Sequence, residues 1–191
     1  MTREIRFSLP QWAADVAAAA TSLFDVDERM RFVIAASRRN IAERTGGPFG
    51  AAIFERDSGR LVALGVNIVE ARGLSILHAE IVAIALAQNA LGGYDLSARG
   101  HHDLISSAEP CAMCFGAVGW SGVSRLVVGA RREDVERAGF DEGAKPENWP
   151  DELLLRGIET IRDVERAEAA QVLADYAKAG GLIYNAGLTG R

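Results

Sequence analysis

The sequence is poor in the residues that cross-link chains or bind metals. Its two cysteines are Cys111 and Cys114, and its three histidines are His78, His101 and His102. Two cysteines at this spacing exclude the framework of several disulfides that stabilises many small secreted proteins. They suit a reducing compartment, so we expect a cytoplasmic protein.

Long apolar runs are also lacking. The best candidate near the N-terminus, residues 13–20, is interrupted by Asp15. A membrane-spanning helix requires about eighteen or more residues with few or no charges. The sequence therefore predicts neither a signal peptide nor a membrane anchor.

Positive charge is not in excess. The formal net charge is -5, and the arginine pairs Arg38-Arg39 and Arg131-Arg132 are interleaved with acidic residues. Proteins that bind phosphate backbones usually present clustered Lys and Arg. We therefore interpret these pairs as solvated helix faces and expect no nucleic-acid partner.

The remaining composition is that of an ordinary globular protein. Of 191 residues, 49% are hydrophobic and 25% are charged, which is enough apolar material for a substantial core. We expect an N-terminal extension over residues 1–27, packed as a helix on the main body, and one domain over residues 28–191.

Two short motifs carry the chemistry. His78-Ala79-Glu80 and Pro110-Cys111-Ala112-Met113-Cys114 each begin an apolar stretch. One imidazole and two thiolates suit zinc, and three protein ligands leave the fourth tetrahedral position for water. Glu80 is placed to accept and donate a proton beside that water.

Each motif alone has an ordinary alternative. A single Cys-x-x-Cys is also typical of a redox pair or a structural metal knuckle. A lone histidine at a helix head is often a core residue, and another histidine could close the metal site. Jointly, His-x-Glu followed about thirty residues later by Pro-Cys-x-x-Cys is the pattern of zinc-dependent deaminases.

Apolar periodicity and turn residues predict alternating helices and strands. His101 and His102 are expected in an exposed loop, and residues 139–150 in a loop bounded by Pro150. This alternation favours a layered α/β domain with a mainly parallel or mixed sheet. The expected helices cover about 28–43, 79–91, 110–121, 133–138 and 165–178, and the expected strands about 51–54, 61–67, 103–107, 125–130 and 158–164.

Three further segments extend the pattern. Residues 47–51 read GPFGA, residues 107–117 read SAEPCAMCFGA and residues 138–142 read AGFDE. With the zinc motifs, they resemble the cytidine deaminase-like superfamily, and within it the bacterial guanine deaminases, over about residues 28–185. The resemblance implies a three-layer α/β/α sandwich with a mixed five-stranded sheet.

The resemblance also implies substrate-binding residues. Asn67 would contact the base, Phe49 would meet the face of its ring, and Trp120 is expected as a core or pocket-wall aromatic. The backbone N-H of Ala79 would be available to a substrate carbonyl. The alternative for Asn67 is a strand-end residue that hydrogen-bonds its own loop.

The acid that assists the leaving amine is implied at Glu142. The family would equally place an aspartate there, so Asp141 and Glu142 are both candidates to face the substrate. The alternative for both residues is a solvated loop, because acidic loop residues are common.

The sequence therefore predicts a zinc-dependent enzyme, with one ion per chain, that hydrolyses guanine to xanthine and ammonia in purine catabolism. The alternatives are a tRNA adenosine deaminase, a cytosine-type deaminase and a non-catalytic, zinc-stabilised binding module. The resemblance further implies a homodimer, in which exchanged C-terminal tails would let Tyr184 close the partner's pocket.

Overall fold

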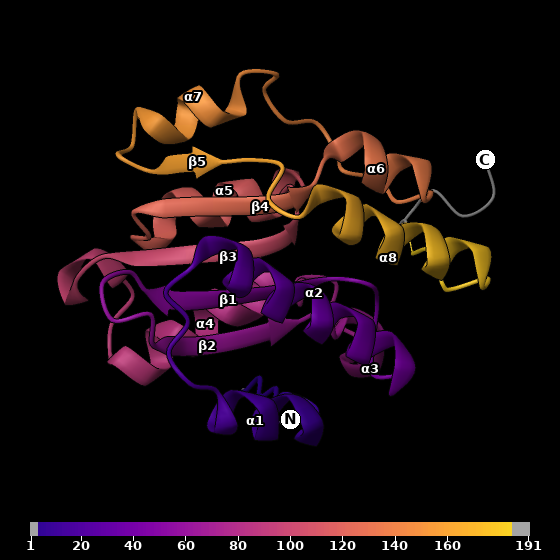
Figure 1. The fold of residues 1–191 in the computed structure, drawn as a ribbon, viewed down its shortest axis with the longest axis horizontal. Helices are drawn as coiled ribbons and strands as arrows, with labels where there is room; N and C mark the ends of the chain where they lie inside the picture. The colour runs from indigo at the N-terminus through magenta and orange to yellow at the C-terminus, as the bar shows by residue number, and fades with distance from the viewer. Residues whose placement is uncertain (1–3, 185–191) are drawn as a thin grey trace.

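A computed structural model describes residues 4–184, and its centre is a five-stranded sheet (Figure 1). The strand order is β2-β1-β3-β4-β5. β1 pairs antiparallel with β2 and β3, whereas β3, β4 and β5 are parallel, so the predicted mixed sheet is confirmed. The strands are β1 (Gly50–Glu55), β2 (Leu61–Val66), β3 (His102–Ala108), β4 (Arg125–Ala130) and β5 (Glu159–Ile161).

Helices cover both faces of the sheet, which confirms the predicted three-layer arrangement. α2 (Val26–Ala42) and α8 (Arg166–Lys178) lie in front of the sheet in Figure 1, and α4 (Ala79–Leu91) and α5 (Ala112–Ser121) lie behind it. Each side has its own cluster of buried apolar side chains. The shorter helices are α1 (Gln11–Ala19), α3 (Val69–Arg72), the 3-10 helix η1 (Leu96–Arg99), α6 (Arg132–Arg137) and α7 (Trp149–Leu154).

Local sequence explains most element boundaries. The Asp25 carboxylate caps α2 by accepting from the N-H groups of Asp27 and Glu28, and this cap supplies donors that a helix N-terminus leaves unpaired. α4 spans the residues expected for a buried helix, and it ends at Gly92 with a positive φ of 69°. Sequence and structure therefore agree best where a cap or a glycine stop marks the end.

Gly65 on β2 permits a close approach of α4 to the sheet. A Cβ atom at this position would lie 2.2 Å from the carbonyl oxygen of Ala79 and 2.6 Å from the nitrogen of Ala83. No side chain fits at those distances. The missing side chain therefore sets how closely the first turns of α4 rest on β2.

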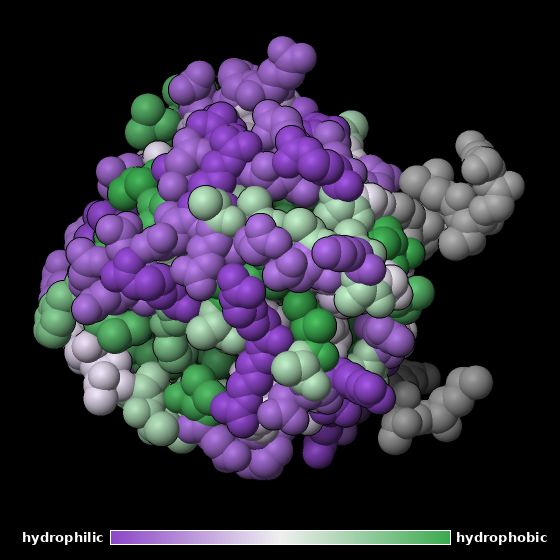
Figure 2. All heavy atoms as spheres, turned by 45° about the vertical axis from the view of Figure 1, so that its right-hand side comes forward, coloured by the Kyte–Doolittle hydropathy of each residue, from purple (hydrophilic) through white to green (hydrophobic). Residues whose placement is uncertain are grey.

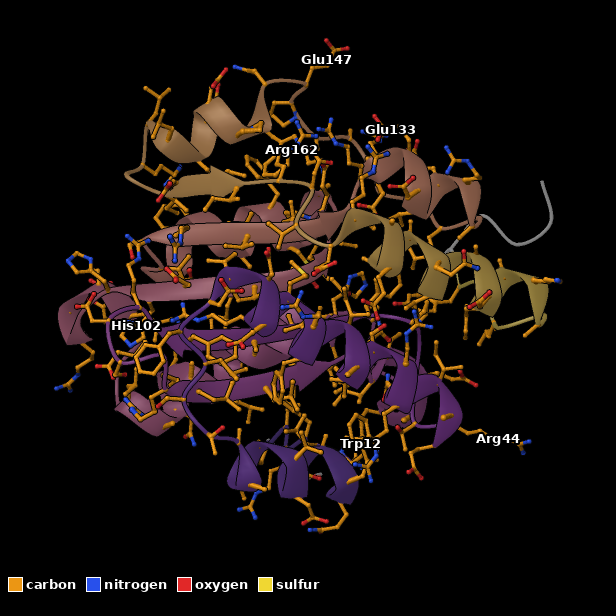
Figure 3. All side chains as sticks on the ribbon, in the orientation of Figure 1. Trp12, Arg44, His102, Glu133, Glu147 and Arg162 are labelled. Carbon is orange, nitrogen blue, oxygen red and sulfur yellow. The ribbon has the colours of Figure 1, made fainter. Side chains whose placement is uncertain are left out.

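The N-terminal segment includes a helix packed on the main body. Trp12 of α1 is 8% exposed, its Nε1-H donates to Thr45 Oγ1 at 3.0 Å, and Arg39 lies over its ring. Figure 3 shows Trp12 pointing from α1 toward the body of the protein. Within residues 4–184, no helix is both long and apolar enough to cross a membrane.

Three local expectations were wrong. His102 is buried and begins β3, where it pairs with Glu55, whereas a solvent-exposed loop was predicted. α5 begins at Ala112, so Pro110 precedes the helix instead of starting it. A loop was expected through Pro150, but α7 already begins at Trp149. Pro150 is compatible with the first turn of this helix, because an N-H group there has no intrahelical acceptor to lose.

Candidate metal centre and active site

The two motifs meet where the N-termini of α4 and α5 approach each other. His78 is the N-cap residue of α4, Cys111 is the N-cap residue of α5, and Cys114 lies in the first turn of α5. One ligand atom from each residue lies within 4.8 Å of the other two. His78 Nδ1 is 3.6 Å from Cys111 Sγ, so this ring nitrogen faces the thiols.

The surroundings of the two thiols prepare Cys111 to bind a cation. The hydrogen bond from the Cys114 thiol, aided by His78, lowers the pKa of Cys111 to about 4. The same hydrogen bond and burial raise the pKa of Cys114. Thiolate is the form that binds metal, and a helix N-terminus stabilises its negative charge.

These donors fit a zinc ion. One imidazole nitrogen and two thiolate sulfurs are a known ligand set for catalytic zinc. Within residues 4–184, these three residues form the group that could hold a metal, and it includes no fourth histidine or cysteine. A non-catalytic module with a closed site would need a fourth protein ligand, which this group lacks.

Glu80 lies one helical position past Ala79 and points into the same site. It is 7% exposed, and burial raises the pKa of its carboxyl group, with the nearby Cys111 thiolate adding to the effect. It also lines a small cavity beside His78 and Cys111. A carboxyl group with a raised pKa next to a metal site is suited to take up and return a proton.

The cavity has a volume of about 40 Å³, which is room for about three water molecules. Several of the predicted site residues lie in its wall. The lining residues are Phe49, Asn67, His78, Glu80, Glu109, Cys111, Phe140, Asp141, Glu142 and Tyr184.

Asn67 makes the local loop contact that was the alternative for it, and its amide also reaches the cavity. Its Oδ1 accepts from the backbone N-H of Val69 at 3.3 Å, which is the local loop contact. Its Nδ2-H donates to the Tyr184 hydroxyl at 2.6 Å, inside the cavity. Asn40 on α2 donates to the backbone oxygen of Asn67 and fixes this strand end.

Aromatic rings form one side of the cavity. Phe49 meets Phe140 edge to face with ring centroids 5.0 Å apart, and Phe140 meets Tyr184 at 6.2 Å. Tyr176 of α8 stacks behind Phe140. Phe49 therefore lines the cavity, and contact of its ring with a base stays a prediction.

Glu142 and Asp141 differ in their surroundings. Glu142 is 5% exposed, and its Oε2 is buried without a hydrogen-bond partner among the described residues. Burial raises its pKa to about 8, and the nearby Cys111 and Glu80 add to this effect. Asp141 is exposed and accepts from the N-H of Gly143 at 2.8 Å. Both acids line the cavity, and Glu142 is the more buried of the two.

Two predicted substrate-binding residues lie elsewhere. Ala79 is buried at the first position of α4 and is not among the residues that line the cavity. Its N-H is one of the donors that a helix N-terminus leaves without an intrahelical acceptor. Trp120 is 77% exposed, carries Arg156 over its ring at 5.1 Å and does not line the cavity. The expectation of a core or pocket-wall ring at Trp120 is wrong, because this position of α5 faces away from the sheet.

Tyr184 and Glu109 were not assigned to this cavity from the sequence. The Tyr184 hydroxyl lies 3.5 Å from His78 Nε2 in the same chain, whereas the expectation placed it in a partner's pocket. The rest of the expected exchanged tail, residues 185–191, lies outside the described residues. Glu109 directly precedes Pro110 and Cys111, and this position in the sequence could have indicated that Glu109 lies near the metal site.

The comparisons with known proteins agree with this geometry. Residues 25–130 match the model of the cytidine and deoxycytidylate deaminase zinc-binding region. The solved structure of guanine deaminase from Nitrosomonas europaea is 46% identical, with a TM-score of 0.89 over 93% of this chain and 98% of that chain.

Curated relatives match over shorter stretches. Guanine deaminase of Bacillus subtilis is 39% identical over 97 residues, which are 51% of this chain and 59% of that protein. The tRNA-specific adenosine deaminase of Rickettsia bellii is 35% identical over 83 residues, which are 44% of this chain and 55% of that protein. The chain thus matches less than two thirds of the length of these curated relatives.

The family model covers more than half of the sequence, and it is a model of a zinc-binding region. The predicted metal and the predicted superfamily are therefore confirmed. This chain belongs to the cytidine and deoxycytidylate deaminase zinc-binding family.

Proposed function

We propose that the protein hydrolyses guanine to xanthine and ammonia. The observation that carries the proposal is the set of groups around one cavity: three metal ligands, the buried acid Glu80, the amide of Asn67 and the unpartnered carboxyl oxygen of Glu142. The near end-to-end match to a guanine deaminase supports guanine over other bases.

His78, Cys111 and Cys114 would hold the zinc ion. When bound, the ion supplies a Lewis acid that lowers the pKa of a water molecule from about 15.7 toward about 7. Glu80 accepts a proton from the attacking water and passes it to the ring nitrogen next to the reacting carbon. Negative charge therefore does not accumulate on the ring.

The remaining residues hold the base and help the amine to leave. Asn67 Nδ2-H is a donor for the base, and Phe49 packs against its ring. The N-H of Ala79, at the first position of α4, is a donor for the substrate carbonyl. Glu142, whose pKa is raised to about 8 by burial, donates a proton to the amine as the C–N bond breaks. Glu80 accepts the proton of the new hydroxyl as the carbonyl forms, and proton exchange with solvent after release of ammonia returns both carboxyl groups to their starting states.

Substrate entry requires Tyr184 to move. A purine ring is larger than a cavity that holds about three waters, and the Tyr184 hydroxyl now takes the hydrogen bond of Asn67 Nδ2. Tyr184 lies six residues past the end of α8, so its displacement leaves the sheet and the metal ligands in place.

The test is an ammonia-release assay on free guanine, 2,6-diaminopurine, adenine, cytosine and an adenosine-containing tRNA, with zinc content measured in parallel. We expect guanine to have the highest kcat/KM and Glu80→Gln to serve as the inactive control. Release from the tRNA alone would replace this proposal with a tRNA adenosine deaminase, which the net charge of -5 disfavours.

We also propose a cytoplasmic homodimer that acts in purine catabolism. Trp120, Leu154 and Leu155 are 77%, 63% and 83% exposed, and such apolar side chains support a surface for a second copy. Light scattering should give twice the chain mass, and Trp120→Glu should shift it toward the monomer.

Truncation after Lys178 tests tail exchange, because unchanged mass and activity would contradict it. Fractionation of the source cells tests the compartment.

A further inference from the structure

Lys145 is a lysine in an unusual place. The sequence holds two lysines, Lys145 and Lys178, and Lys178 is exposed at the end of α8. The side chain of Lys145, in contrast, is 1% exposed. Lysine is almost never fully buried unless it is paired, because removing an ammonium group from water is costly.

The Lys145 ammonium has three kinds of neighbour. It donates to the backbone oxygen of Pro110 at 2.8 Å, lies 3.7 Å from Glu109 Oε2, and lies 4.9 Å from the centre of the Trp149 ring. Glu109 is also shared, because Arg162 Nε donates to its Oε1 at 2.9 Å. Arg162 lies beneath the connection between α6 and α7, as Figure 3 shows.

The charges of this cluster are therefore unequal. Two cations, Lys145 and Arg162, share the single carboxylate of Glu109. Glu142 lies three residues before Lys145, and burial, Cys111 and Glu80 all raise its pKa. Among the groups that lower the pKa of Glu142, Lys145 has the largest effect. Its positive charge therefore favours the carboxylate form of Glu142 more than any other nearby group does.

Two hydrogen bonds fasten the segment from Glu142 to Lys145 onto the metal-ligand segment. The N-H of Ala112 donates to the backbone oxygen of Glu142 at 2.9 Å, and Lys145 reaches the oxygen of Pro110. Pro110, Cys111 and Ala112 are consecutive, so the two bonds lie on either side of a metal ligand. Both ends of this short segment, Glu142 and Lys145, are thereby attached to the residues at the N-terminus of α5.

We propose that Lys145 is a positioning residue that holds the Glu142 carboxyl group in the cavity by anchoring its segment to Pro110 and Glu109. The proposal rests on the proposed deamination and assigns Lys145 no contact with the substrate. It predicts that Lys145 contributes to turnover through Glu142 and leaves the metal in place.

The test is a double-mutant cycle of Lys145→Met with Glu142→Gln. Loss of the anchor should lower kcat by about 10- to 100-fold with KM within about twofold, because small misplacements of a reacting group are costly. In the Glu142→Gln background the same change should lower kcat by less than about twofold. Equal losses in both backgrounds would show a contribution independent of Glu142 and overturn the proposal.

Three further variants make the result specific. Lys145→Gln keeps a hydrogen-bond donor for the Pro110 oxygen but removes the positive charge. If Lys145→Met does not fold, Lys145→Gln replaces it in the double-mutant cycle with Glu142→Gln. Lys178→Met changes the other lysine, and Glu147→Gln changes an exposed acid of the same segment, whose side chain points outward in Figure 3. Both controls should retain wild-type kcat.

Amide hydrogen exchange provides a readout that does not depend on turnover. In Lys145→Met, exchange across residues 141–148 should accelerate about tenfold or more, while zinc per chain, measured by mass spectrometry of the metal, stays at one. Unchanged exchange would contradict the anchor. If the wild-type protein releases no ammonia from guanine, the proposed function fails, and this measurement still decides whether Lys145 anchors the segment.

Discussion

The two walls of the cavity are built in different ways. One wall, which we term the helical wall, consists of His78, Glu80, Cys111 and Cys114 at the N-termini of α4 and α5. The opposite wall, the loop wall, consists of Phe140, Glu142 and Tyr184, and none of these residues lies in a helix or strand. The sheet carries the first wall, whereas hydrogen bonds and aromatic contacts between chain segments hold the second.

This difference separates two tasks. Metal ligands must stay within a few tenths of an ångström of their positions, and buried helix ends provide that rigidity. A base must enter and leave, and Tyr184, six residues past the end of α8, can move without disturbing a strand. We therefore expect changes in the helical wall to abolish the reaction and changes in the loop wall to reduce it.

The strongest test of the helical wall is removal of a thiolate. Cys114→Ser should reduce zinc to less than about a tenth of an ion per chain and lower activity by more than about a thousandfold, because a hydroxyl is a poor zinc ligand. Metal analysis and the ammonia assay measure the two effects. A serine variant that retains stoichiometric zinc would show that the site tolerates two ligands.

Glu80→Gln tests the proton transfer at the helical wall while the zinc ion stays bound. The amide has nearly the same shape but cannot exchange a proton, so kcat should fall by about 10²- to 10⁴-fold while zinc stays at one per chain. Steady-state kinetics and metal analysis provide the comparison. Wild-type turnover in this variant would remove the proton-transfer role.

Asn67→Ala tests recognition of the base. Loss of one hydrogen bond to the base should raise KM by about 10- to 100-fold, with a smaller change in kcat. The same substitution also releases the Tyr184 hydroxyl. Tyr184→Phe is the matched control, because it removes that hydroxyl and keeps the Asn67 amide. A KM in Asn67→Ala equal to that of the control would contradict direct recognition.

The smallest expected effect is on the free energy of unfolding at acid pH, through Asp134 in the helix that precedes Phe140 of the loop wall. Asp134 of α6 accepts from Arg166 Nε at 2.8 Å and from the N-H of Arg131 at 3.0 Å. The hydrogen bond from Arg166 lowers its pKa from 3.8 to about 2.

A lowered pKa means that the folded state favours the charged carboxylate. The stabilisation is therefore complete above pH 4 to 5, and it is lost as the pH falls from about 4 toward about 2. Wild-type protein should lose about 2 kcal/mol of unfolding free energy over this range through Asp134. Asp134→Asn should lack that loss, which urea unfolding at several pH values would detect.

Much of the helical wall could be predicted from the sequence. His78, Glu80, Cys111 and Cys114 lie in two short motifs whose spacing reflects helix geometry, and local residues such as Gly92 mark where the elements end. The alternation of apolar strands and helices predicted a mainly parallel or mixed sheet, and the family resemblance implied the mixed five-stranded one. These features depend on residues that are near one another in the chain.

The resemblance implied Glu142 of the loop wall, but the long-range contacts that hold this wall together required the structure. Tyr184 and Asn67 meet across 117 positions, and Lys145 and Pro110 meet across 35. No periodicity encodes such contacts. Trp120 was assigned wrongly for a related reason, because periodicity does not tell which side of a short apolar helix faces the sheet when the helix contains several glycines.

Gly65 bears on how variants of this protein would be interpreted. The residue touches neither the metal ligands nor the cavity, yet any side chain there would push the carbonyl of Ala79 outward and lift the turn that carries His78 and Glu80. A random-mutation screen scored by loss of bound zinc should thus return position 65 together with the three ligands. Because Gly65 contributes no side chain to the site, the cause would not be evident from a list of site residues.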